Sequence, residues 1–344
     1  MKPVLNMATP VTNRTSLRAL GMSILTVGLV ACGGGSDSAS TSAGGGAPVA
    51  AITISPANAQ SIAGAALDSG MGSLDLGESL GVVGVETSNV VPNNRVLSRL
   101  TANAVKKVVE QRSAPESVTG VITILSCSGV AGDTASGTFS VDNFDGTTSA
   151  QVTFTNCKFD PSETTNGAMT FSNMVATASS VSGTVSLNLT TTTTGGPAVT
   201  VGGGFTFTVT GIDAVTKTTI MTGSGLTMTE GTLTETISNF NFTSSLNSST
   251  RIYTDSANFT LASTALGGSV TFETLTALQT NEANLYPHTG VAHIMGAGST
   301  SLHITILGNE TLAGSQVRID FDADGTAPII YENTSLVTWA TLNP

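Results

Sequence analysis

The segment Phe205-Thr206-Phe207-Thr208-Val209-Thr210 decides the fold class, because apolar and hydroxyl side chains alternate along it without interruption. Successive side chains of a β-strand point to opposite faces, so this pattern predicts a strand with one apolar and one threonine-rich face. The same alternation occurs at 226–229 and at 270–275. Threonine and valine are β-branched and therefore fit a pleated sheet better than a helix.

Similar segments recur along the chain from residue 118 onward, separated by short clusters of Gly, Asn, Ser and Asp. The further strand candidates are 118–126, 136–142, 150–157, 167–175, 181–190, 232–243, 251–262, 301–307, 315–322 and 334–342. Short turns can join only antiparallel neighbours. We therefore expect a mostly β (α+β) protein with a large antiparallel β-meander over 114–344, forming a curved sheet or half-barrel.

Two helices are expected in the helical segment 51–113, packed on this sheet. The first follows Ser55-Pro56, since serine caps helices and proline suits a first helical turn. The second covers 93–112, where apolar residues fall on one side and most basic residues on the other. Its basic side either faces solvent or meets anionic lipid headgroups.

Composition narrows the function classes. Only 10% of the 344 residues are charged, and the net charge is −11. A protein that binds nucleic acid needs clustered cations, so no nucleic-acid partner is expected.

The N-terminus reads as an export signal over 1–31. Lys2, Arg14 and Arg18 precede an apolar run over 19–31, which is too short to cross a bilayer. The run ends in Leu29-Val30-Ala31-Cys32, which resembles a bacterial lipobox.

That resemblance implies that Cys32 is acylated after cleavage and holds the protein on a membrane. No Asp follows Cys32, which by the same resemblance implies the outer membrane, facing the periplasm or the cell surface. Several acyl chains, palmitate among them, make such an anchor permanent. Residues 32–50 are a Gly/Ser-rich tether.

More widely, the chain resembles a group of proteobacterial outer-membrane lipoproteins. The resemblance lies in the lipobox, in Asn58-Ala59 with Ile62-Ala63, in the Cys-framed region and in the C-terminal Asp-rich turn. It implies no particular activity.

Cys127 and Cys157 remain once Cys32 is set aside. In an exported protein such a pair predicts a disulfide, the alternative being two reduced, buried thiols. If strand 136–142 lies between the two cysteine-bearing strands, their ends are about 10 Å apart. A bridge then requires a curled loop.

Two groups of residues are candidate metal ligands. Asp320, Asp322 and Asp324, followed by Gly325, match the first half of a calcium loop, although Glu332 comes one residue after the twelfth position. The alternative is an acidic solvated turn.

His288, His293 and His303 are the only histidines of the chain. A turn at 296–299 would set His293 across from His303, and the three imidazoles would suit zinc or copper. The alternative is a surface pair without metal.

The sequence contains no nucleophile elbow, HExxH motif, phosphate loop or dinucleotide fingerprint. We therefore expect a lipid-anchored envelope protein with a non-enzymatic structural or binding role. The alternatives are a periplasmic carrier of lipid or another apolar ligand and a calcium-stabilised surface adhesin.

Overall fold

The computed structural model describes residues 49–81, 122–127, 136–142, 149–158, 163–212, 214–281, 284, 286–308, 316–325 and 331–342. The expected export signal, Cys32, most of the tether and the second helix over 93–112 lie outside these residues.

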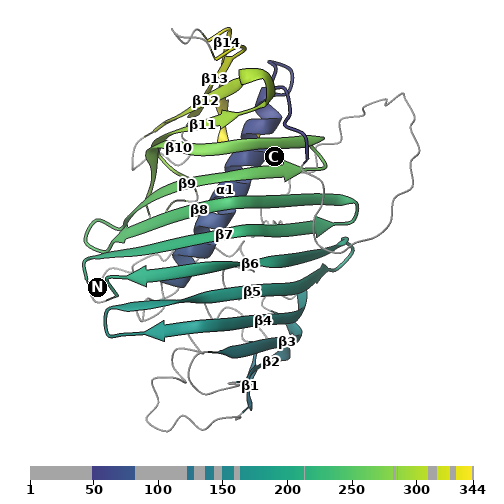
Figure 1. Cartoon of the computed structure of the whole chain (residues 1–344), viewed down its shortest axis with the longest axis vertical. Coiled ribbons are helices and arrows are strands. Elements are labelled where there is room, and N and C mark those ends of the chain that lie inside the picture. The colour runs from purple at the N-terminus through teal and green to yellow at the C-terminus, as the bar shows by residue number, and fades with distance from the viewer. Residues whose placement is uncertain are drawn as a thin grey trace, which may run out of the picture.

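The described strands form one open antiparallel sheet of fourteen strands (Figure 1). Each strand pairs with its neighbours in the chain, and β1 and β14 are the two edges. The strands are β1 (Ile122–Ser126), β2 (Ser136–Asp142), β3 (Ala150–Lys158), β4 (Glu163–Ala176), β5 (Ser180–Thr193), β6 (Ala198–Thr210), β7 (Thr216–Glu230), β8 (Leu233–Asn247), β9 (Ile252–Ser263), β10 (Gly268–Asn281), β11 (Thr289–Met295), β12 (Ser301–Leu307), β13 (Gln316–Asp322) and β14 (Asn333–Thr338). The expectation of a mostly β protein built on an antiparallel meander is confirmed.

The alternation along β6 separates the two faces of the sheet as expected. Phe205, Phe207 and Val209 are buried, whereas Thr206 is exposed. On the outward face, the hydroxyl groups of Thr206 and Thr222 on adjacent strands are hydrogen-bonded at 2.7 Å. The inner face of the sheet therefore contributes to the core, and the outer face exposes hydroxyl groups.

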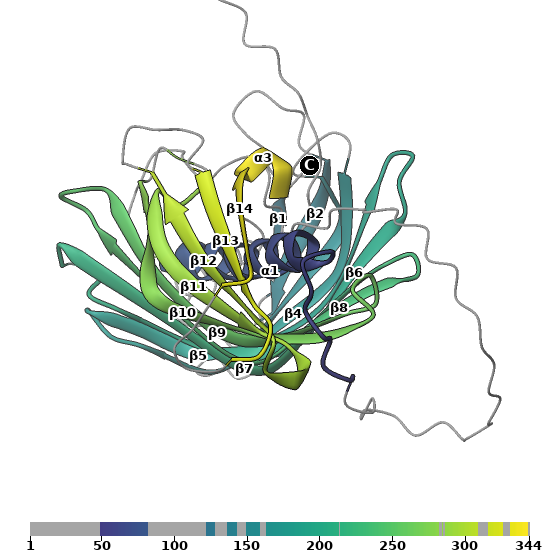
Figure 2. The same cartoon turned by 90° about the horizontal axis from the view of Figure 1, so that it is seen from above.

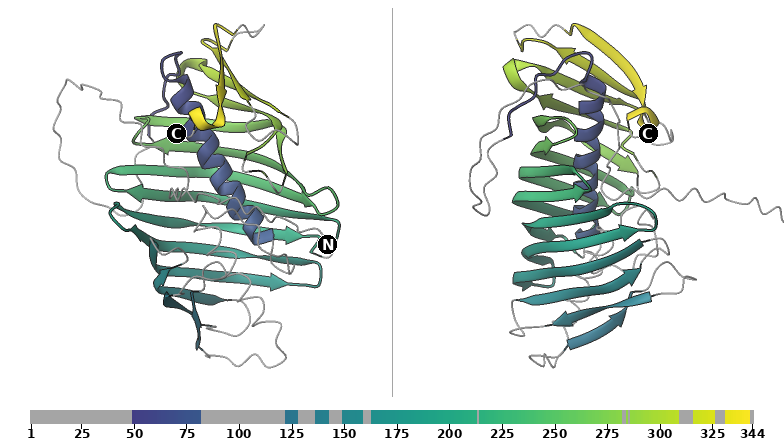
Figure 3. Two further views of the ribbon diagram at one scale, coloured as in Figure 1. Left: turned by 180° about the vertical axis from the view of Figure 1, so that it is seen from behind. Right: turned by 90° about the vertical axis from the view of Figure 1, so that its right-hand side faces the viewer.

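Helix α1 (Ala59–Gly81) lies on the concave side of the curved sheet (Figures 2 and 3). It packs against β6–β9, β12 and β13. Its apolar side is buried and consists of Ile62, Ala63, Ala66, Leu67, Met71 and Leu74. The first expected helix is thus present, and burial of this side holds it in place.

This helix begins a few residues later than the sequence suggested. Residues 56–58 form a turn in which the Asn58 side chain accepts a hydrogen bond from the Ser55 backbone N–H at 2.8 Å. The Ala59 N–H donates to the Ser55 carbonyl at 2.9 Å. These bonds stabilise the turn that leads into the helix.

The strand expected over 334–342 ends at Thr338, and α3 (Trp339–Leu342) follows it. Trp339 and Leu342 are both buried, and the Trp339 ring stacks on Tyr286 with centroids 5.0 Å apart. Residues three apart share one face of a helical turn but lie on opposite faces of a strand. A helical turn therefore lets both side chains reach the core, where α3 packs against α1 (Figure 3).

Cys127 and Cys157 form a disulfide, with Cα atoms 5.5 Å apart. The separation of about 10 Å expected for regular strands does not apply, because the ladder between β2 and β3 shifts register between Ser136 and Thr138. Gly137 lies at this shift with a φ of 84°, and Asn156 on β3 also has a positive φ of 48°. A side chain at Gly137 would collide with the Asn156 carbonyl, so the close approach requires glycine.

Among the described residues, no helix combines the length and hydrophobicity that a membrane span requires.

Candidate functional site

A row of polar side chains crosses the outward face of the sheet near its C-terminal edge. Glu273 of β10 pairs with His293 of β11, which pairs with His303 of β12. His303 in turn pairs with Asp320 of β13, and Asp320 with Thr334 of β14. Directly opposed residues project to the same face. The meander thereby gathers residues from five strands into one line.

The two histidines at the centre of the row lie in direct register. The 3-10 turn η1 (Ala297–Ser299) joins β11 to β12, with Gly298 at a φ of 63°. Burial and the neighbouring His303 lower the pKa of His293, while Glu273 and Asp322 oppose this shift. The ring of Tyr331 stacks on His303 with centroids 5.8 Å apart. The turn predicted at 296–299 thus places His293 opposite His303.

The structure separates His288 from this pair. His288 precedes β11, lies five residues from His293 and is only 4% exposed. Among the described residues, the three histidines do not bring their ring nitrogens together as a group that could hold a metal ion. Its backbone N–H donates to the Gln279 carbonyl at 2.8 Å, which ties His288 to β10.

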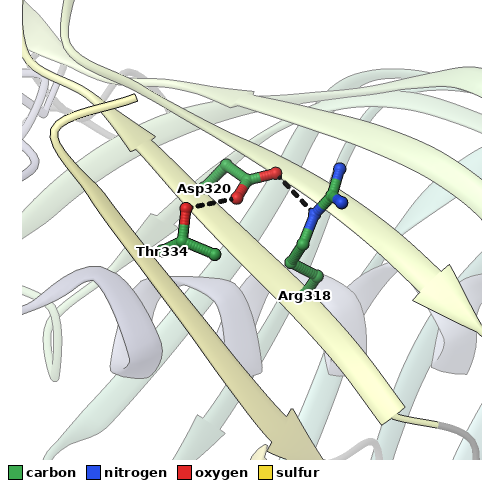
Figure 4. A network of polar contacts seen from close by, with 3 residues as sticks. All are labelled: Arg318, Asp320 and Thr334. Atoms are coloured by element: carbon green, nitrogen blue, oxygen red, sulfur yellow. Dashed lines mark hydrogen bonds and ion pairs between the residues drawn. The ribbon is translucent and has the colours of Figure 1, made fainter. Parts of the chain in front are cut away.

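Asp320, at the end of the row, has both carboxylate oxygens engaged (Figure 4). Arg318 Nε donates to Oδ2 at 2.8 Å, and Thr334 Oγ1 donates to Oδ1 at 2.8 Å. The Asp320 side chain is buried. The bond from Thr334 fastens the edge strand β14 to β13, whereas the bond from Arg318 lies within β13. Asp320 therefore stabilises the pairing of the edge strand, and its carboxylate does not belong to the group of converging carboxylates that contains Asp322 and Asp324.

A different acidic residue joins those two. The carboxylates of Asp322, Asp324 and Glu332 each place an oxygen within 4.8 Å of the others. The Asp322 Oδ1 accepts the backbone N–H of Asp324 at 3.2 Å and that of Gly325 at 3.0 Å. Glu332 Oε2 accepts the backbone N–H of Ala323 at 2.8 Å. Three converging carboxylates are suited to a hard cation, and calcium binding here stays a prediction.

In the sequence, Glu332 lies one residue beyond the position at which an EF-hand loop has its glutamate, so the EF-hand pattern did not predict it as a ligand. The antiparallel return of the chain into β14 brings Glu332 beside the end of β13, where its backbone N–H donates to the Phe321 carbonyl at 3.0 Å. Strand pairing, and not the spacing of an EF-hand loop, positions this carboxylate.

Acidic side chains also lie on the concave face, which the sequence did not predict. Burial, and to a smaller extent the charge of Asp68 on α1, raise the pKa of Glu235 to about 7. Burial likewise raises the pKa of Asp255 to about 7, although a hydrogen bond with Ser244 opposes the shift. These carboxyl groups are distant in sequence, so only the folded arrangement reveals them.

Comparison of the chain with protein-family models, with characterised proteins and with solved structures found no match.

Proposed function

We propose that this protein is a lipid-anchored component of a bacterial cell envelope, with a non-enzymatic structural or binding role performed by its open sheet. The lipobox at Leu29–Cys32 supports the anchor. The Cys127–Cys157 disulfide supports an oxidising compartment outside the cytoplasm.

The end of the tether has a defined place on the sheet. Ala51 forms a bridge with Ser269 at the start of β10, the Ser269 N–H donates to the Ala50 carbonyl, and the Ile52 N–H donates to the Ser269 carbonyl, both at 2.9 Å. The Ser269 hydroxyl donates to the Val49 carbonyl at 3.0 Å. The end of the tether is thus bonded to the sheet at the start of β10, and the rest of the tether would act as a spacer between this point and an acyl group on Cys32.

The outward face of the central strands is the observation that carries the proposed role. Thr184, Thr206, Thr222, Asn241 and Asn258 form one row of directly opposed residues across β5–β9. The row carries no charge and no large apolar side chain. Such a face offers many weak hydrogen bonds over a wide area, which suits extended contact with a neutral polar partner.

The anchor and the ligand state are tested together by mass spectrometry of the native protein extracted in detergent. We expect the acylated mature chain alone, with no copurifying small molecule. Palmitate labelling should disappear in Cys32→Ser and persist in Cys127→Ser, which is the matched control. Labelling that persists in Cys32→Ser would contradict the lipid anchor.

The apolar concave face supports a lipid carrier as a second candidate. This face continues beyond the C-terminal end of α1 onto β2–β5 (Figure 1). Phe139, Phe154, Met169 and Phe171 supply large apolar side chains there, and all four are buried, so a lipid could contact them only if the fold opens. If the protein is a carrier, the native mass spectrum should show a bound lipid of defined mass, and organic extraction should remove that lipid. The bare acylated chain would exclude this second role.

A further inference from the structure

The pair of histidines on the outward face is not used by the proposed function, and its two members stand in direct register on adjacent strands. Directly opposed residues of an antiparallel pair have Cβ atoms about 4.5–5.5 Å apart. Two imidazole nitrogens bound to one tetrahedral ion at about 2.0–2.1 Å lie about 3.3 Å from each other. His293 and His303 can therefore reach one ion by side-chain rotation alone.

The strands that carry the pair are firmly held. Seven consecutive residue pairs join β11 to β12, from Thr289 with Leu307 to Met295 with Ser301, without a register shift. The next pairing, of β12 with β13, is also regular over seven residue pairs. A site built on regular strands keeps its ligand spacing better than a site on loops.

One ring nitrogen of His303 supports the same conclusion. Nδ1 of His303 is buried and has no hydrogen-bond partner among the described residues. A buried polar atom without a partner is costly and requires an explanation. Ligation of a metal ion would supply the missing partner.

The charge around the pair favours a cation. Glu273 lies directly opposite His293, and both Glu273 and Asp322 act electrostatically on that histidine. Asp320 faces His303, but its two oxygens are bonded to Arg318 and Thr334. Glu273 is therefore the carboxylate best placed to add a third ligand, with water completing the shell.

We propose that His293 and His303 form a binding site for a divalent transition-metal ion of the zinc and copper class, with Glu273 as the neighbouring carboxylate. Imidazole ligands suit these ions, whereas calcium takes oxygen ligands. The site is therefore chemically distinct from the carboxylates of Asp322, Asp324 and Glu332. The proposal is independent of the lipid anchor and of the role of the sheet.

The test uses detergent-extracted protein without a histidine tag, treated with chelator and then titrated with Zn²⁺ or Cu²⁺. We expect one ion per chain and, for Cu²⁺, an electron paramagnetic resonance spectrum with imidazole nitrogen coupling. His293→Asn and His303→Asn should each weaken binding by more than the roughly tenfold that loss of an outer-shell partner costs. Glu273→Gln should weaken it less.

Two controls distinguish this site from its surroundings. His288→Asn removes a histidine but leaves the pair, and Glu332→Gln alters the acidic turn, so neither should change the affinity for Cu²⁺. Fluorescence of Trp339, the single tryptophan of the chain, reports whether each variant is folded. Equal affinity in wild type and in the His293→Asn/His303→Asn double variant would overturn the proposal. A Cu²⁺ spectrum of the wild type without imidazole coupling would overturn it as well.

Discussion

Asp68 of α1 and Glu235 of β8 repel each other across the interface between the helix and the sheet. The charge of Asp68 adds to the effect of burial in raising the pKa of Glu235 to about 7. Hydrogen bonds with Ser263 and Ser69 oppose this shift but do not cancel it. The protein therefore places two acidic groups where its only described long helix meets the core.

Glu235→Gln should make the protein more stable at alkaline pH. A carboxyl group whose pKa is higher in the folded than in the unfolded state binds more protons when folded, so stability falls as pH rises between the two values. For Glu235 this window runs from about 4.5 to about 7. Each pKa unit corresponds to about 1.4 kcal/mol, so we expect a gain on the order of 3 kcal/mol at pH 8 and little change at pH 4.

Thermal unfolding across this pH range measures the effect. Glu230→Gln, at the end of β7, makes the same substitution on the neighbouring strand and serves as the control. A pH-independent difference between Glu235→Gln and wild type would contradict the explanation.

Because Cys127 and Cys157 share one disulfide, we expect the losses of stability caused by substituting each of them not to add. Closing a loop with a sequence separation of 30 should stabilise the fold by about 3–4 kcal/mol in the chain-entropy model. Cys127→Ala should therefore lower the melting temperature, and the double variant with Cys157→Ala should add little, because one bond is lost in either case. Denaturant unfolding of both single variants and the double variant checks this. Additive losses would mean that the two residues act separately.

We expect substitution of Gly64 by alanine to disturb the packing of α3 against α1. A Cβ atom at Gly64 would lie 2.6 Å from the Leu342 carbonyl oxygen, so Gly64→Ala must displace α3. Alanine gains up to about 1 kcal/mol in a helix, but overpacking typically costs about 1–3 kcal/mol. We expect a net loss of stability and a red-shifted emission from Trp339. Gly225→Ala on β7 is a control for the steric effect alone, since a Cβ there meets nothing within 4 Å.

The strands could be predicted from the sequence because each carries its own signal. The alternation at 205–210 needs no knowledge of its neighbours, and short turns then dictate antiparallel order. The pairing of His293 with His303 was predictable for the same reason, since one short turn separates the two strands.

Other features depend on contacts between distant parts of the chain. Asp68 meets Glu235 only because the helix crosses the concave face. Residues 339–342 continue directly from a strand, and burial of Trp339 and Leu342 against α1 selects a helical turn there. Contacts with distant residues thus decide where the strand ends.

The acidic turn leads to a prediction about calcium. Asp322, Asp324 and Glu332 repel one another at their observed spacing, and a bound calcium ion would relieve this repulsion. Binding to the folded state alone raises stability by RT ln(1 + [L]/Kd), about 1.4 kcal/mol for millimolar calcium and a Kd of about 0.1 mM. We expect the melting temperature of the wild type to be higher in calcium than in chelator.

Substitutions at the exposed members of the turn test this prediction. Asp324→Asn and Glu332→Gln should each abolish the effect of calcium while raising or preserving the melting temperature in chelator, because one repelling charge is removed. Asp322 is less suitable, since it is buried and accepts the backbone N–H groups of residues 324 and 325. Glu273→Gln, which lies outside the turn, should leave the calcium effect intact. If the wild type melts at the same temperature in calcium and in chelator, the three carboxylates form only an acidic surface turn.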